Sequence, residues 1–143
     1  MAKSKIGVWL ARLLVFAVFF VNVSCAFSFI FFPEYYIGSY ELTGAPGLAA
    51  LQGIGVTFLM WNVTYPLVIV RPDRYRVLFV VVLAQQLVGL IGESFILLTL
   101  PEGHAMLASG ISRFIVFDAA GLVLMLIGFF LSRNPEERVT QDR

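Results

Sequence analysis

Three ionisable side chains lie well inside long apolar segments of this chain: Glu93, Arg113 and Asp118. A charge at membrane depth is costly, so such residues usually pair with other groups or mark a path for a ligand or an ion. A carboxylate there must be protonated, paired or hydrated, whereas an arginine can hold an anionic group. These three residues are therefore the first candidates for a functional site.

Amide side chains share the helical faces that carry these charges. At about 100° per residue, Gln86 and Glu93 fall on one small-residue face, and Gln52 and Asn62 share a narrow arc of the preceding apolar segment. Polar faces should point into a bundle, away from lipid. The predicted ligand-binding residues are Glu93, Arg113, Asp118, Gln52, Asn22, Asn62 and Gln86.

Depth along each segment predicts which of these residues meet. At about 1.5 Å per residue, Glu93 and Arg113 both lie roughly 7–11 Å from the outer end of consecutive helices. We therefore expect them to be adjacent and paired, either as a structural ion pair or as a site for an anionic head group. Asp118 lies nearer the midplane, where it would face another neighbour such as Asn22.

Composition places these residues in a membrane protein. Of the 143 residues, 59% are hydrophobic and 13% are charged, whereas soluble domains carry roughly 25% charged residues. The net charge of +1 indicates no nucleic-acid partner. One cysteine and one histidine argue against a structural zinc site.

The expected fold is all-α, a single polytopic bundle of four transmembrane helices. A helix needs about 20 mostly apolar residues to cross the hydrocarbon core. Proline and glycine separate four such segments, and Pro66 should kink the second near its inner end. The predicted helices span about 7–32, 47–70, 75–100 and 108–131, followed by a tail over 132–143.

Charge outside these segments predicts their orientation. Lysine and arginine lie before the first segment, between the second and third, and in the tail. The other two loops carry Glu34, Glu41 and Glu102 instead. Basic residues stay on the cytoplasmic side, so both termini are predicted to be cytoplasmic in a multi-pass membrane protein. The start also resembles a signal peptide, but its apolar run continues to Phe32, too long for a signal core.

Particular stretches of the chain fit a known layout. These are the entry Thr43-Gly44-Ala45-Pro46-Gly47 before Gln52-Gly53-Ile54-Gly55, a glycine-bearing third segment, and a charged fourth segment from Ser112-Arg113 to Asp118. The chain resembles the small four-helix bacterial membrane proteins of the DoxX-like group, or another family of the same layout. Some members of that group are linked to quinone-coupled sulfur oxidation as partners of other subunits. The resemblance therefore implies a bundle that works with a partner in the bacterial inner membrane.

We predict a non-catalytic bundle that binds a partner subunit or a small lipophilic or anionic ligand in a polar intramembrane site. The alternative is a homodimeric, proton-coupled transporter that uses Glu93 or Asp118. A lipid-modifying or redox enzyme would use these two acids with Arg113 as an anion clamp, but the sequence defines no nucleophile. We expect no resident cofactor, although a quinone or a lipid would suit the site. The expected partners are the lipid bilayer and either another membrane subunit or a second copy of the chain.

Overall fold

A computed structural model describes residues 2–133, and over these residues it contains helices and no strand. The predicted all-α fold is confirmed over these residues, and four stretches are long and apolar enough to cross a membrane. The elements are α1 (Ala2–Phe31), η1 (Pro33–Tyr35), η2 (Ile37–Tyr40), α2 (Gly44–Asn62), α3 (Tyr65–Val70), α4 (Arg76–Thr99) and α5 (Ala105–Leu131). Apart from residues 132 and 133, the predicted tail lies outside the described residues.

The second span is divided into two helices, α2 and α3. The break covers Val63 and Thr64, and Pro66 lies at the start of α3. Proline has no backbone N–H and its ring collides with the preceding turn, so it is tolerated at a helix start and not inside one. The kink predicted at Pro66 is therefore a complete interruption of the helix.

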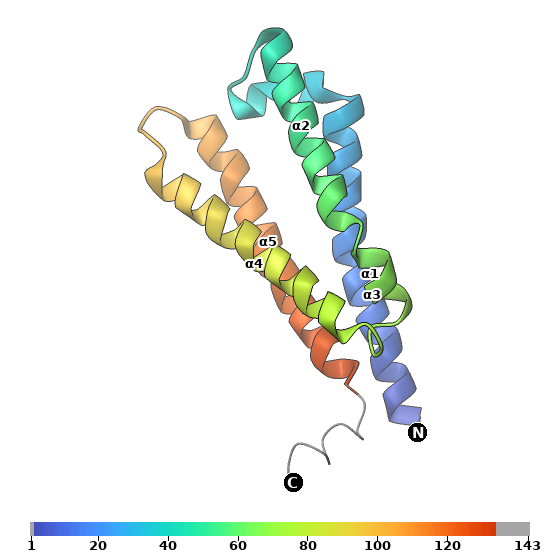
Figure 1. Cartoon of the computed structure of the whole chain (residues 1–143). Helices are drawn as coiled ribbons and strands as arrows, with labels where there is room; N and C mark the ends of the chain where they lie inside the picture. Colours follow the sequence, from blue (N-terminus) through green and yellow to red (C-terminus); the bar gives the residue numbers. More distant parts are fainter. Residues whose placement is uncertain (1, 134–143) are drawn as a thin grey trace.

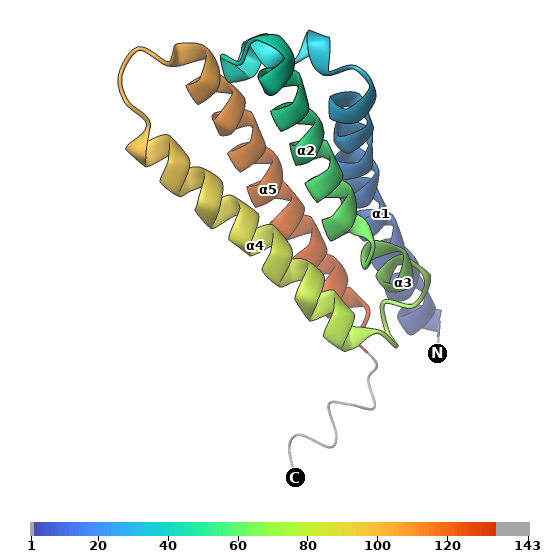
Figure 2. The same cartoon turned by 45° about the horizontal axis from the view of Figure 1, so that its top comes forward.

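The helices form a bundle that is closed at one end and open along one side (Figure 1). α1 packs against α2, α3 and α5, and α4 packs against α5. α3 touches α4, whereas α2 and α4 share no substantial contact. Figure 2 shows α4 diverging from α2 toward the connection that leads to α5. The side between α2 and α4 is therefore the open one.

Buried apolar side chains hold the closed end together. The core is formed by Val15, Val18, Tyr65, Val68, Phe79, Val82 and Met125. Many large apolar side chains point outward instead, such as Leu98 at 85% exposure. An apolar exterior around a small core is what a lipid solvent requires, since polar surface in lipid is costly.

Two arginines fasten helix ends at this closed end. Arg12 of α1 donates to the Val70 carbonyl at 2.7 Å, at the end of α3. Arg76 of α4 donates to the Phe129 carbonyl at 2.8 Å and lies 3.6 Å from the centre of the Phe129 ring. The last carbonyls of a helix have no partner within the helix, so these arginines satisfy groups that would otherwise be unpaired.

Candidate functional site

A chain of polar side chains connects the four spans. Gln86 of α4 is 5% exposed. Its Nε2 donates to Oδ1 of Asp118 on α5 at 2.8 Å, and its Oε1 accepts from the Tyr65 hydroxyl of α3 at 3.3 Å. Asn22 of α1 lies beside that hydroxyl. Asn22, Tyr65, Gln86 and Asp118, called the polar chain below, therefore bring one polar group from each span into the interior.

Glycines on the facing helices make room for the polar chain. A Cβ at Gly89 of α4 would lie 2.5 Å from Oδ2 of Asp118. A Cβ at Gly121 of α5 would lie 2.9 Å from Nε2 of Gln86. Each helix thus places a glycine opposite the polar side chain of the other. Small residues let membrane helices approach closely, and here they also admit an amide and a carboxyl group between α4 and α5.

The polar chain lines a cavity of about 290 Å³ between α2 and α4, called the groove below. Asn62 of α2 and Glu93 of α4 line the same cavity. Its aromatic walls are Phe58, Trp61 and Phe114, and Trp61 at 41% exposure lies at the rim. Because α2 and α4 share no substantial contact, the groove opens toward the side of the bundle.

Two buried oxygen atoms in the groove-lining residues accept no hydrogen bond from any described residue: Oδ1 of Asn62 and Oε2 of Glu93. Nδ2 of Asn62 donates to the Phe58 carbonyl at 2.7 Å, so only its oxygen lacks a partner. An unsatisfied buried polar group costs about 1–3 kcal/mol. No lysine, arginine or histidine is among the described residues that line the groove. A ligand group that satisfies either oxygen atom is therefore a hydrogen-bond donor or a cation.

The predicted pair of Glu93 and Arg113 is not formed. Where both partners are described residues, the one ion pair joins Glu41 and His104, and neither Glu93 nor Arg113 takes part in one. Asp118 faces α4, and Arg113 lies five residues earlier, about 140° around the same helix. Arg113 therefore points away from α4 and lines two other cavities, beside α1 and η2. Glu93 and Arg113 are at similar depth, but Arg113 is on the side of α5 that faces away from α4, the helix that carries Glu93.

Gln52 also lies apart from the groove. Its side chain is exposed, and its Nε2 donates to the Ile30 carbonyl of α1 at 3.0 Å. Ile30 is in the last turn of α1, where carbonyl groups need outside partners. Gln52 thus fastens α2 to the end of α1. The groove brings together the other predicted residues except Arg113, namely Asn22, Asn62, Gln86, Glu93 and Asp118.

The sequence reasoning missed Tyr65 and the aromatic walls. Tyr65 follows Asn62 by three residues, a spacing that places both on one side of a helix and could have indicated its role. Phe58 and Phe114 carry no such signal, because aromatic residues occur throughout this chain. They meet only in the folded bundle, with ring centres 6.0 Å apart.

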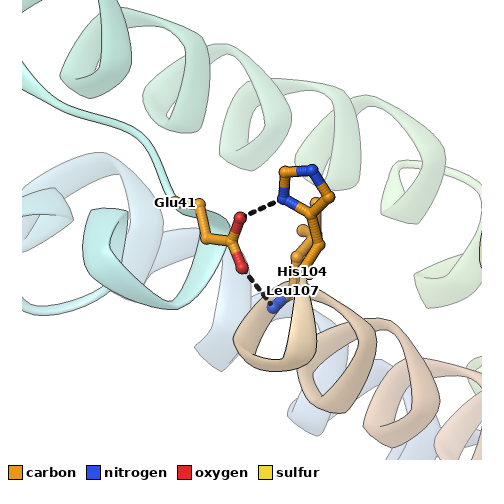
Figure 3. A network of polar contacts seen from close by, with 3 residues as sticks. All are labelled: Glu41, His104 and Leu107. Carbon is orange, nitrogen blue, oxygen red and sulfur yellow. Dashed lines mark hydrogen bonds and ion pairs between the residues drawn. The ribbon is translucent and has the colours of Figure 1, made fainter. Parts of the chain in front are cut away.

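Glu41, in the connection between η2 and α2, contacts residues at the start of α5, and Figure 3 shows it beside His104 and Leu107. One carboxylate oxygen is hydrogen-bonded to Nδ1 of His104, and the other accepts from the Leu107 backbone N–H at 3.4 Å. Leu107 is in the first turn of α5, where N–H groups lack partners within the helix. The hydrogen bond from His104 is the main reason that the pKa of Glu41 lies below its ordinary value of 4.5.

This contact predicts a pH-dependent contribution to stability. Because the folded-state pKa of Glu41 is lowered, the contribution is present above pH 4.5 and is lost as the pH falls through that lowered pKa. Glu41→Gln should lower the melting temperature slightly at pH 6, and the difference from the wild type should vanish in acid. Glu34→Gln, at another exposed acid of the same connection, is the control. A difference unchanged down to pH 3 would contradict this reading.

Comparisons of the chain with protein-family models, with curated proteins and with solved structures found no match. The described residues also contain no group of three or more histidine, cysteine, aspartate or glutamate side chains suited to a metal ion. The functional reading therefore depends on the groove and on the cavities beside Arg113.

Proposed function

We propose that this protein is a non-catalytic membrane bundle that binds a lipophilic ligand bearing hydrogen-bond donors in the groove. The observation that carries the proposal is the pair of unpartnered acceptors, Oδ1 of Asn62 and Oε2 of Glu93, in residues lining one cavity. Two donors, such as hydroxyl, amide or ammonium groups, would relieve them. A hydrogen bond to a charged group contributes about 1.5–3 kcal/mol, so a donor at Glu93 would add substantially to affinity.

The size and position of the groove support an amphipathic ligand. Its volume of about 290 Å³ is at the lower end of the roughly 300–1,000 Å³ of common ligand sites. It suits a head group or a ring, with the apolar remainder between α2 and α4 or in the bilayer. The aromatic walls of Phe58, Trp61 and Phe114 would pack against the ring.

A quinol or a hydroxylated lipid has the required chemistry. A quinol brings two hydroxyl donors, whereas an oxidised quinone brings only acceptors and would need a protonated Glu93 or Asp118. This preference agrees with the quinone-linked role that the DoxX-like resemblance implies. A transmembrane helix of a partner subunit, with a basic or amide side chain, is the competing occupant of the groove.

Native mass spectrometry of the gently extracted protein tests the proposal. We expect a defined small mass on the wild type and roughly tenfold lower occupancy on Glu93→Gln, equivalent to about 1.4 kcal/mol. Glu34→Gln makes the same substitution at an exposed site outside the groove and should bind as the wild type does. A bound polypeptide would identify a partner subunit instead, and equal occupancy of both variants would place the ligand elsewhere.

The second candidate is a proton-coupled transporter, and one observation favours it. Glu93 and Asp118 line the same cavity, and two acids in one membrane cavity could exchange a proton for a substrate. Proton movement in vesicles that requires a substrate, and that Asp118→Asn abolishes, would favour this reading. An absence of proton movement when the ligand from the mass spectrum is supplied would count against it.

We also propose that both termini are cytoplasmic in the bacterial inner membrane. Arg12 and Arg76 contact helix ends at one end of the bundle. Arg71 and Arg74 lie at the same end, in the turn between α3 and α4. Glu41 lies at the other end, and basic residues favour the cytoplasmic side. In a chain with Cys25→Ala, Glu102→Cys should react with an impermeant thiol reagent on intact cells, and Arg74→Cys should not. The reverse pattern would invert the orientation.

A further inference from the structure

Arg113 lines two adjoining cavities on the side of α5 that faces away from α4. One has a volume of about 390 Å³ and lies between α1, α5 and the two short helices η1 and η2. The other, of about 240 Å³, lies beside the start of α5. Ser39 of η2 lines both cavities together with Arg113. The arginine is therefore at the junction of two spaces, and it does not line the groove, although the larger space shares Asn22 and Phe114 with it.

No hydrogen bond or ion pair joins Arg113 to another described residue. Its Cα lies eight residues into α5, about 12 Å along the helix axis. An arginine in a membrane helix is normally paired or reaches water or a head group. Both acids near this depth, Glu93 and Asp118, line the groove instead. The cavities beside Arg113 thus present one positive charge and no carboxylate among their described lining residues.

The lining of these cavities is polar near Arg113 and largely apolar deeper in the bundle. Hydroxyl groups of Ser39, Tyr40 and Ser109 lie in the walls. Burial raises the pKa of Tyr40, so its phenol stays protonated and can donate a hydrogen bond. Deeper than Arg113, the larger cavity is lined by Val21 and Phe117 together with Asn22 and Cys25. A ligand that fits has an anionic head and an apolar chain.

The position of Tyr40 is fixed by its neighbours. Its ring packs edge-on against Phe29 of α1, with centres 5.6 Å apart. Gly110 of α5 lies opposite η2, and a Cβ there would lie 3.6 Å from the Ser39 carbonyl. These contacts hold η2 against both helices and keep the hydroxyl-bearing wall in place. The packing of η2 on α1 and α5 therefore forms the wall of the cavity beside Arg113.

We propose that Arg113, with the hydroxyl groups of Ser39, Tyr40 and Ser109, binds the phosphate of an anionic phospholipid whose chain lies against Val21 and Phe117. Guanidinium binds phosphate oxygens in a bidentate manner, and hydroxyl donors supply further hydrogen bonds. A soluble phosphate ester shares the head-group chemistry but lacks the chain. The larger cavity shares Asn22 and Phe114 with the groove, but Arg113 and the three hydroxyl-bearing residues do not line the groove. Loss of phosphate binding at Arg113 would therefore leave the proposed function standing.

Lipid titration of the purified full chain tests this site. Binding is measured by native mass spectrometry and by melting temperature with dioleoyl phosphatidylglycerol, dioleoyl phosphatidylcholine or glycerol 3-phosphate. We expect phosphatidylglycerol to bind the wild type best and about tenfold more weakly to Arg113→Gln, with Arg113→Lys between them. Arg74→Gln, which removes an exposed arginine at the other end, should bind as the wild type does.

Each outcome decides the matter. Equal phosphatidylglycerol binding by the wild type and Arg113→Gln would overturn the site. Equal binding of glycerol 3-phosphate and phosphatidylglycerol would overturn the role of the lipid chain and assign the site to soluble phosphate esters. If Arg113→Gln does not fold, Tyr40→Phe provides the test, because it removes only a hydroxyl group. It should weaken phosphatidylglycerol binding several-fold, and unchanged binding would overturn the proposed set of donors.

Discussion

Gly55→Leu should prevent the bundle from folding stably. Gly55 of α2 is buried against α1, and even a Cβ there would lie 2.8 Å from the Ala26 carbonyl oxygen and 2.8 Å from Cγ1 of Ile30. Backbone oxygen atoms cannot move aside as the end of a side chain can. Forcing extra carbon atoms into a packed contact costs about 1–3 kcal/mol, and a leucine against backbone should reach or exceed the upper value.

Gly53 provides the matched control, because it is on the same helix and nothing lies within 4 Å of a Cβ built there. Gly53→Leu should keep or slightly raise the melting temperature, since leucine is a better helix former than glycine by about 1 kcal/mol. The two variants are compared by melting temperature in detergent and by yield after extraction. Similar losses in both would contradict the packing of α1 on α2 described above.

Gln86→Leu should give the second largest loss, because it breaks the polar chain at its centre. Asp118 would lose its donor at 2.8 Å, and the Tyr65 hydroxyl would lose its acceptor. Leaving buried polar groups unpaired costs about 1–3 kcal/mol for each group. Gln85→Leu is the control on the adjacent residue, which is less buried and makes one long contact of 3.4 Å with Thr64.

A double variant separates a broken hydrogen bond from a general packing defect. Gln86→Leu combined with Asp118→Leu removes both partners, and such a replacement is often nearly neutral. We expect the double variant to be more stable than Gln86→Leu alone, by melting temperature. A double variant that loses the sum of the two single effects would indicate that the residues do not interact.

The sequence was sufficient for the four spans and for five of the residues that line the groove. Hydrocarbon thickness fixes the length of an apolar segment, so the four stretches follow directly. Asn62, Gln86 and Glu93 were identified from helical faces, because a polar face in a membrane bundle must point inward. These inferences use short-range geometry that a single helix already has.

The pairing of residues across helices was harder to predict. Depth places Glu93 and Arg113 at one level, but the rotation of α5 is set by how Asp118 and Gly121 pack on α4. Gln52 was assigned to the site because it shares an arc with Asn62, whereas the Ile30 carbonyl at the end of α1 holds it elsewhere. Both results depend on tertiary contacts that no single helix specifies.

Photo-crosslinking from the rim of the groove tests the central claim most directly. Trp61 is replaced by the photoreactive amino acid p-benzoylphenylalanine, and Leu98, which is 85% exposed on α4, is replaced likewise as the control. After irradiation in cells, intact-protein mass spectrometry reads the adducts. A discrete lipophilic adduct at position 61, with only a mixture of bulk lipids at position 98, is the predicted result. The same lipid mixture at both positions would contradict a ligand-binding groove.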